Sequence, residues 1–86
     1  MAKVQEAGLT VRIISPFTTY YEGPAVSVTA LNETGPFDIL LNHAKFFSVL
    51  QSGEVVVNTG ADIQRFDIER GIIRVADNVV TLFANV

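Results

Sequence analysis

His43 is the only histidine in the chain, and histidine is the side chain whose charge ordinarily changes near neutral pH. It lies in the segment GPFDILLNHAKFF, residues 35–47, five positions after Asp38. A serine hydrolase would need such a base beside a nucleophile and an orienting acid, and the sequence has no Gly-x-Ser-x-Gly motif. We therefore predict that the chain has no catalytic residues and is not an enzyme.

Metal ligands and phosphate-binding loops are equally poorly supported by the sequence. A metal site would require several histidines or carboxylates in one place, and His43 with Asp38 is too small a set. The chain has no cysteine, which excludes disulfides, thiolate ligands and thiol nucleophiles. Gly53, Gly60 and Gly71 are isolated and do not form a glycine-rich phosphate loop. We expect no metal, no cofactor and no small-molecule substrate.

The charged residues indicate a solvated surface. Arg65, Asp67 and Glu69 alternate along residues 61–69, so in a strand they would share one side and form weak ion pairs there. The 6 basic residues of the chain are scattered singly and the net charge is −3, which argues against nucleic-acid binding. No run approaches the ~20 apolar residues that span a bilayer, and residues 1–9 lack the apolar region of a secretory signal. We therefore expect a soluble, intracellular chain without direct membrane insertion.

Short β-rich segments follow one another along all 86 residues. Turn-forming Gly, Pro, Asn and Asp separate them every 8–12 residues or so, and no window shows a helical period; residues 43–50 could form one helical turn at most. Asp77-Asn78 is expected to be a two-residue hairpin. The pattern predicts an all-β domain over residues 1–86, a small antiparallel β-sandwich or flattened barrel of about nine to ten strands, with residues 1–8 as a loose N-terminal segment. The expected strands are 9–15, 18–23, 25–30, 36–41, 45–51, 54–59, 61–69, 71–76 and 79–84.

Alternation within these strands predicts which side chains form the core. Leu9, Val11 and Ile13 should share one inner face, and so should Val26, Val28 and Ala30.

Two pairs of adjacent aromatics, Tyr20-Tyr21 and Phe46-Phe47, should each place one ring inside and one ring outside. Exposed apolar side chains that gather on one face would mark a protein interface. Ile14, Phe47 and Ile73 are candidates for such a patch.

Three longer stretches carry a family resemblance. The segment VRIISPFTTYYEG is similar to a first hairpin, GPFDILLNHAKFFSVLQSGEV to a histidine-containing segment, and DIERGIIRVADNVVTLFAN to closing strands. In this order and spacing, from Leu9 to Asn85, the chain resembles the N-terminal β-sandwich domain of the epsilon subunit of F-type ATP synthases. The family usually continues into a helical hairpin, credited with rotation inhibition and ATP sensing. The given sequence ends at Val86, so neither property is carried over.

The histidine loop departs from the family pattern. Asp38, Leu41 and Asn42 stand where the family commonly has Gly, Pro and Gly, and Lys45 replaces a Pro. Because Gly and Pro fix special backbone angles, their loss predicts a changed loop shape. Elsewhere, Glu69-Arg70-Gly71 replaces Ser-Gly-Gly.

The resemblance implies a non-catalytic central-stalk subunit of the rotor. Such a subunit docks on the gamma shaft and on the c-ring, couples rotation to ATP synthesis or hydrolysis, and lies peripherally on the cytoplasmic face, or the equivalent matrix or stromal face, of an energy-transducing membrane. The residues that the resemblance places toward the c-ring are Gly35, Pro36, Phe37, Asn42 and His43. Those that could face gamma are Ser15, Tyr20 and Phe47.

One alternative is a free-standing β-sandwich that binds a protein or itself, with no role in an ATP synthase. It would associate through an edge strand or an exposed aromatic patch. Such a module would self-associate in isolation and would not bind the shaft.

Overall fold

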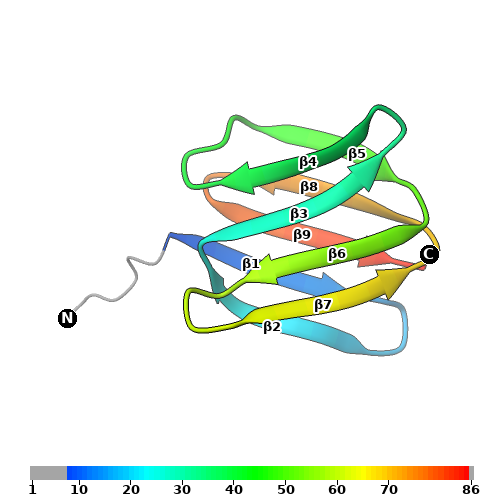
Figure 1. Ribbon diagram of the computed structural model, residues 1–86, viewed down its shortest axis with the longest axis horizontal. Coiled ribbons are helices and arrows are strands. Elements are labelled where there is room, and N and C mark those ends of the chain that lie inside the picture. Colours follow the sequence, from blue (N-terminus) through cyan, green and yellow to red (C-terminus); the bar gives the residue numbers. More distant parts are fainter. Residues whose placement is uncertain (1–7, 86) are drawn as a thin grey trace.

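The computed structural model describes residues 8–85 as nine strands joined by short turns (Figure 1). Most of the predicted loose segment 1–8 lies outside the described residues. No helix within residues 8–85 is long and apolar enough to cross a membrane. The predicted all-β class is confirmed. The strands are β1 Leu9–Ile14, β2 Thr19–Ala25, β3 Ser27–Asn32, β4 Gly35–Leu40, β5 Phe46–Leu50, β6 Gly53–Asn58, β7 Ile63–Ile68, β8 Gly71–Ala76 and β9 Val79–Ala84.

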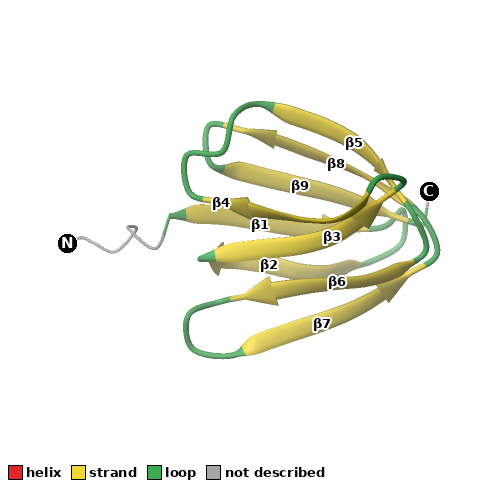
Figure 2. Cartoon of the chain, turned by 45° about the horizontal axis from the view of Figure 1, so that its top comes forward, coloured by secondary structure: helices red, strands yellow, loops and turns green. Residues whose placement is uncertain are grey.

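The strands form two layers that face each other (Figure 2). The hydrogen-bonded order is β2-β1-β9-β8-β5-β3-β6-β7, with β4 added beside β3. One layer contains β4, β3, β6 and β7, and the other contains β5, β8, β9, β1 and β2. The two layers are joined at one corner, where Asn32 of β3 pairs with Leu50 of β5. The result is the expected sandwich, rolled toward a flattened barrel.

One strand pair differs from the predicted antiparallel arrangement. β1 and β9 run parallel, with Thr10 opposite Val79 and Ile14 opposite Phe83. Parallel neighbours need a long connection, and here the connection is most of the domain. All other neighbouring strands pair antiparallel.

The core lies between the layers and is built from alternate residues. Leu9, Val11 and Ile13 are fully buried, as the alternation predicted. Val28 and Ala30 are buried as well, but Val26 is 40% exposed, so its predicted place in the core is wrong. The reason is local: Val26 lies at the bend between β2 and β3 and does not take part in the alternation of β3.

Aromatic rings fill the two gaps where the layers are not joined by strand pairing. Tyr21 of β2 and Phe66 of β7 have ring centroids 6.2 Å apart, and Phe37 of β4 and Phe46 of β5 are 5.3 Å apart. All four pack against the core. The neighbouring Phe47 is exposed, as is Tyr20, so the prediction of one inner and one outer ring in each aromatic pair is confirmed.

The connections lie at two opposite ends of the sandwich (Figure 1). The turns β1–β2, β3–β4, β5–β6 and β7–β8 gather at one end, which we call the hairpin end. The loop 41–45 and the turn 77–78 lie at the other end, which we call the histidine end. Asp77 and Asn78 have φ values of 53° and 63°, the two positive values that a type I′ turn requires, which confirms the predicted two-residue hairpin.

Candidate protein-docking surface

Apolar side chains form a continuous row across the outer side of one layer. Val49 of β5 pairs with Ile72 of β8, Ile72 with Phe83 of β9, and Phe83 with Ile14 of β1. Val49 is 60% exposed and Phe83 38% exposed, while Ile14 and Ile72 are half-buried. Because residues that are opposite each other in a sheet lie side by side, these four make one strip.

A second row beside this strip combines an aromatic ring with cations. Phe47 pairs with Arg74, Arg74 with Thr81, and Thr81 with Arg12. Phe47 is 64% exposed. We call the outer side of β5, β8, β9 and β1, which carries both rows, the apolar face. A contiguous apolar surface of this kind on a small domain is typical of a protein–protein contact.

The outer side of the other layer, which we call the polar face, is mostly polar, and its two exposed apolar side chains, Leu40 on β4 and Ile63 on β7, lie at opposite edges of the layer. The Thr29 hydroxyl donates a hydrogen bond to the Asp38 carboxylate at 2.5 Å, and Arg65 makes an ion pair with Glu54 at 3.0 Å. Asp67 is exposed on the same side of β7 as Arg65, as the sequence predicted, but the strand ends at Ile68, so the predicted place of Glu69 in this row is wrong. Exposed pairs of this kind contribute little stability. The contrast between the layers singles out the apolar face as the candidate contact surface.

Ile73 does not belong to the exposed patch that the sequence suggested. Its side chain is fully buried, and its neighbour Ile72 points outward instead. The sequence did contain a signal for this arrangement: Arg74 must point to solvent, so Ile72 shares its side and Ile73 the opposite one. The residues of the apolar face that sequence reasoning missed are Val49, Ile72 and Phe83.

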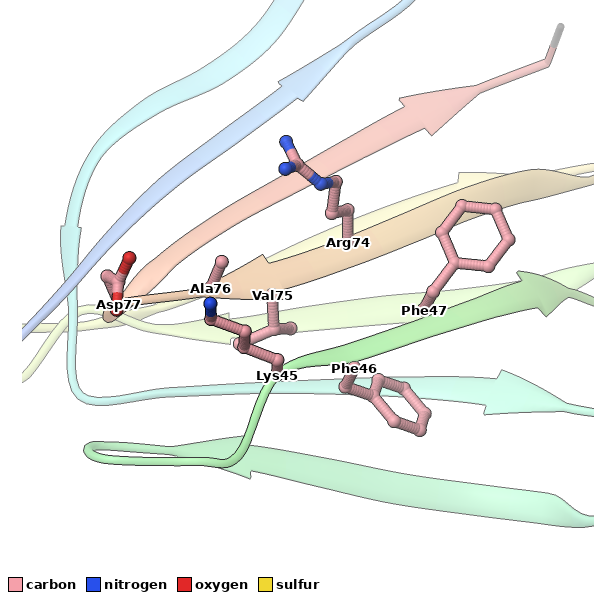
Figure 3. A pocket seen from close by; sticks show the side chains of 7 residues that line it. All are labelled: Lys45, Phe46, Phe47, Arg74, Val75, Ala76 and Asp77. Atoms are coloured by element: carbon pink, nitrogen blue, oxygen red, sulfur yellow. The ribbon is translucent and has the colours of Figure 1, made fainter.

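Shallow hollows lie on both sides of Phe47. One, of about 440 Å³, is lined by Lys45, Phe46, Phe47, Arg74, Val75, Ala76 and Asp77. Figure 3 shows that Arg74 and Phe47 rise to the same side of neighbouring strands, while Phe46 points to the other side. A second hollow, of about 370 Å³, is lined by Glu33, Phe47, Ser48, Val49 and Gln51. Phe47 therefore forms a ridge between two depressions. Side chains of a partner could fit into these depressions.

His43 belongs to the aromatic cluster between β4 and β5. Its ring packs edge-on against Phe46, with centroids 5.4 Å apart. The Nδ1 atom lies 2.8 Å from the carbonyl oxygen of Ala44, and the two are hydrogen-bonded when Nδ1 carries the proton. The backbone N–H of His43 donates to the carbonyl oxygen of Leu40 at 3.1 Å. These contacts hold the His43 ring against Phe46 at the gap between β4 and β5 and leave His43 half-buried.

Asn42 keeps the backbone conformation that a glycine would provide. Its φ is 63°, in the left-handed region that favours Gly and that Asn tolerates best among the other residues. Asn42 therefore adopts this conformation without a glycine, and the predicted change in loop shape relative to the family stays a prediction.

The residues predicted to face the c-ring do not form one loop. Gly35 and Pro36 begin β4 at the hairpin end, whereas Asn42 and His43 follow β4 at the histidine end. A strand of this length spans about 17 Å. Phe37 lies between the two groups, and its ring faces inward against Phe46. The five residues thus lie along β4 and the loop after it. β4 is an edge strand whose hydrogen-bonded neighbour within residues 8–85 is β3.

The other predicted shaft contacts lie at or near the hairpin end. Ser15 shapes the β1–β2 turn, because its Oγ accepts hydrogen bonds from the backbone N–H groups of Phe17 and Thr18 at 3.3 and 3.2 Å. Tyr20 is exposed near the start of β2, away from Phe47 on β5. At the tip of the turn Phe17 is 95% exposed, a residue that sequence reasoning also missed.

The titratable groups of the described residues show little sign of a reactive centre. No group of three or more His, Asp or Glu within residues 8–85 could hold a metal ion. The pKa of Tyr21 is raised above its usual value, mainly by burial and further by the Asp62 carboxylate. The Tyr21 hydroxyl donates a 2.6 Å hydrogen bond to the carbonyl oxygen of Pro24 in the same strand, and the Tyr21 ring contacts Phe66 of β7.

Residues 8–85 thus form a two-layer β-sandwich whose one outer side carries a strip of exposed apolar side chains. The chain matches the family model described as the ATP synthase, Delta/Epsilon chain, beta-sandwich domain over residues 8–86, and it belongs to this family. The resemblance noted in the sequence is confirmed. The chain is 33% identical to the ATP synthase epsilon chain of Caulobacter vibrioides over 78 residues, which are 91% of this chain and 91% of that protein.

Other relatives are longer than the given sequence. The match to the ATP synthase epsilon chain of a Cyanothece species is 34% identical over 90% of this chain and 56% of the relative, so the chain spans little more than half of that protein's length. Solved structures share the fold. A chain in the Euglena gracilis mitochondrial ATP synthase OSCP/F1/c-ring structure has a TM-score of 0.84 at 20% identity, covering 91% of this chain and 51% of that one. A chain in the Tetrahymena thermophila mitochondrial ATP synthase central stalk/c-ring structure has a TM-score of 0.77 at 17% identity, with 88% and 62% covered.

Proposed function

We propose that this chain is a non-catalytic subunit of the central stalk of an F-type ATP synthase. It docks on the gamma shaft and on the c-ring and helps to couple ring rotation to ATP synthesis or hydrolysis. The observation that carries the proposal is an apolar outer face on a domain of the delta/epsilon family. Through these partners the chain is held peripherally at an energy-transducing membrane.

The apolar face is the proposed contact with the shaft. Phe47 and Val49 are the most exposed apolar side chains on it, and the hollows beside them would receive side chains of the shaft. Buried aromatic anchors commonly carry much of the binding energy of an interface. Ser15 and Tyr20, near the hairpin end, would extend this contact only if the shaft reaches past the apolar face.

The c-ring contact is proposed along β4 and the loop that follows it. Pro36 at one end and His43 at the other are the positions to test separately, because the length of β4 lies between them. A ring that touches both must lie along this edge of the sandwich. A ring that touches one group will be affected by variants at that end alone.

The role of the domain would be mechanical. A core of fully buried aliphatic side chains, packed at the density of protein interiors, makes the sandwich resistant to deformation. Such a body transmits force between two partners without taking part in the chemistry of either.

Titration calorimetry of the chain with the purified gamma subunit of the same organism tests this function. We expect a one-to-one complex of micromolar affinity or tighter. Phe47→Ser should weaken it at least tenfold, whereas His43→Ala should leave shaft binding unchanged. No binding from the well-folded chain, or self-association in its place, would contradict the stalk function and favour the free-standing module.

A further inference from the structure

Arg74 occupies the middle of the apolar face. It lies between Phe47 and Thr81 in its row, and the apolar strip of Ile72 and Phe83 runs beside it. No residue within 8–85 makes an ion pair with its guanidinium. Arg12, in the same row, differs: it has Glu22 at 3.6 Å from the neighbouring strand β2.

Lys45 adds a second cation to the same place. It lines the hollow of about 440 Å³ together with Arg74 and Phe47 (Figure 3). Asp77 lines this hollow too, but neither Lys45 nor Arg74 is within ion-pair distance of it. In a chain of net charge −3, two cations thus line one hollow beside the apolar strip, and no carboxylate within residues 8–85 makes an ion pair with either.

Docking would bury the charge of Arg74. A cation that is taken out of water without a partner loses its hydration, which strongly opposes its burial. The apolar surroundings that favour docking would therefore oppose it unless the partner supplies a negative group. The planar guanidinium, with five donors, is best satisfied by a carboxylate that accepts two parallel hydrogen bonds.

We propose that the partner surface seated on the apolar face presents a carboxylate side chain to Arg74 and Lys45, surrounded by apolar side chains. The proposal rests on the function proposed above and names the chemistry of the shaft surface that this chain recognises. Apolar contact supplies the buried area, and the ion pair fixes the orientation in which the chain docks.

Zero-length cross-linking with a water-soluble carbodiimide tests the proposal, because the reagent joins an amine to a carboxylate that touches it. Lys45 is one of two lysines in the chain, the other being Lys3. In the complex with the purified gamma subunit, we expect a cross-link from Lys45 to an Asp or Glu of gamma, identified by mass spectrometry and absent in Lys45→Gln. A complex in which Lys45 joins no gamma carboxylate would argue against the proposal.

Charge reversal provides the second measurement. Arg74→Glu should weaken gamma binding more than tenfold, Arg74→Gln less, and the gain in affinity at low salt should shrink in both. Arg65→Gln, on the polar face, is the matched control and should leave the affinity within about twofold of wild type, since a distant rim charge contributes little. If Arg74→Glu binds gamma as wild type does, this inference is wrong and the stalk function stands. If wild type does not bind gamma, both are wrong.

Discussion

Asn42 and Asn78 bind each other reciprocally across 36 residues of sequence. The backbone N–H of Asn42 donates to the Asn78 Oδ1 at 2.7 Å, and the Asn78 Nδ2 donates to the Asn42 Oδ1 at 3.3 Å. Both residues have a φ of 63°. The pair fastens the loop that carries His43 to the turn between β8 and β9.

Removing the Asn78 side chain should therefore loosen the histidine loop. Asn78→Gly keeps the left-handed backbone conformation and removes both hydrogen bonds, so we expect a loss of about 1–2 kcal/mol in the free energy of unfolding. Asn42→Gly keeps the shorter hydrogen bond, because the donor of that bond is the backbone N–H of residue 42. It should therefore lower the free energy of unfolding less than Asn78→Gly does. Urea unfolding of the two variants measures the difference, and equal costs would contradict the assigned bonds.

Truncation of Ile73 should mainly lower the stability of the domain, and truncation of Ile72 should mainly weaken binding to gamma. Ile73→Ala removes a fully buried side chain and should lower the free energy of unfolding by about 3 kcal/mol. Ile72→Ala removes a half-buried side chain of the apolar face and should cost about 1 kcal/mol or less. In titrations with gamma, Ile72→Ala should weaken binding while a folded Ile73→Ala should not. The reverse order in unfolding would show that the faces of β8 are assigned wrongly.

Alkaline pH should destabilise the domain through Tyr21. Its pKa is raised in the folded state, so the folded state holds the proton more tightly than the unfolded chain. The resulting stabilisation is present below about pH 10, the usual value for tyrosine, and is lost as the pH rises through the folded-state pKa. Tyr21→Phe should reduce this loss, and it should also cost about 1 kcal/mol at pH 7 through the missing bond to Pro24.

Thermal or urea unfolding between pH 7 and pH 11 checks the Tyr21 prediction. Tyr20→Phe, at the exposed neighbouring tyrosine, is the control and should follow the wild-type curve. An identical pH dependence in wild type and Tyr21→Phe would contradict the role given to this hydroxyl.

Gly71 is required because β9 passes close to it. A Cβ at this position would lie 2.8 Å from the carbonyl oxygen of Phe83, a backbone atom that can move only with its strand. We expect Gly71→Ala to cost about 1–3 kcal/mol in unfolding free energy, as overpacking does elsewhere. At Gly23 the nearest atoms to the new methyl belong to the Tyr21 side chain, the closest being its hydroxyl oxygen at 3.3 Å, so Gly23→Ala should cost less unfolding free energy.

The strands could be predicted because their signals are local. Alternation placed Leu9, Val11 and Ile13 in the core, and Asp77-Asn78 is a turn that depends only on its own residues. The parallel pairing of β1 with β9 could not be foreseen, since it is decided by packing between the two ends of the domain. The Asn42–Asn78 bonds are equally non-local.

The candidate surface was predictable only in part. The exposure of Phe47 follows from the sequence, because two adjacent phenylalanines in a strand cannot both point inward. Hydrophobicity alone does not distinguish Ile72 from Ile73, and only the exposed Arg74 indicates that Ile72 is the one that points outward. The apolar strip could not be predicted, because its residues come together only through the strand order, which no local pattern specifies. These residues are Val49, Ile72, Phe83 and Ile14.

Site-directed photo-cross-linking tests most directly the claim that the apolar face docks on the shaft. The chain contains no cysteine, so Phe47→Cys and Asp67→Cys each introduce a single thiol, one on the apolar face and one on the polar face. Each variant is labelled with a benzophenone maleimide, assembled with the gamma subunit and irradiated. The proposed docking predicts a cross-link to gamma from residue 47 and none from residue 67. A cross-link from residue 67 with none from residue 47 would contradict it.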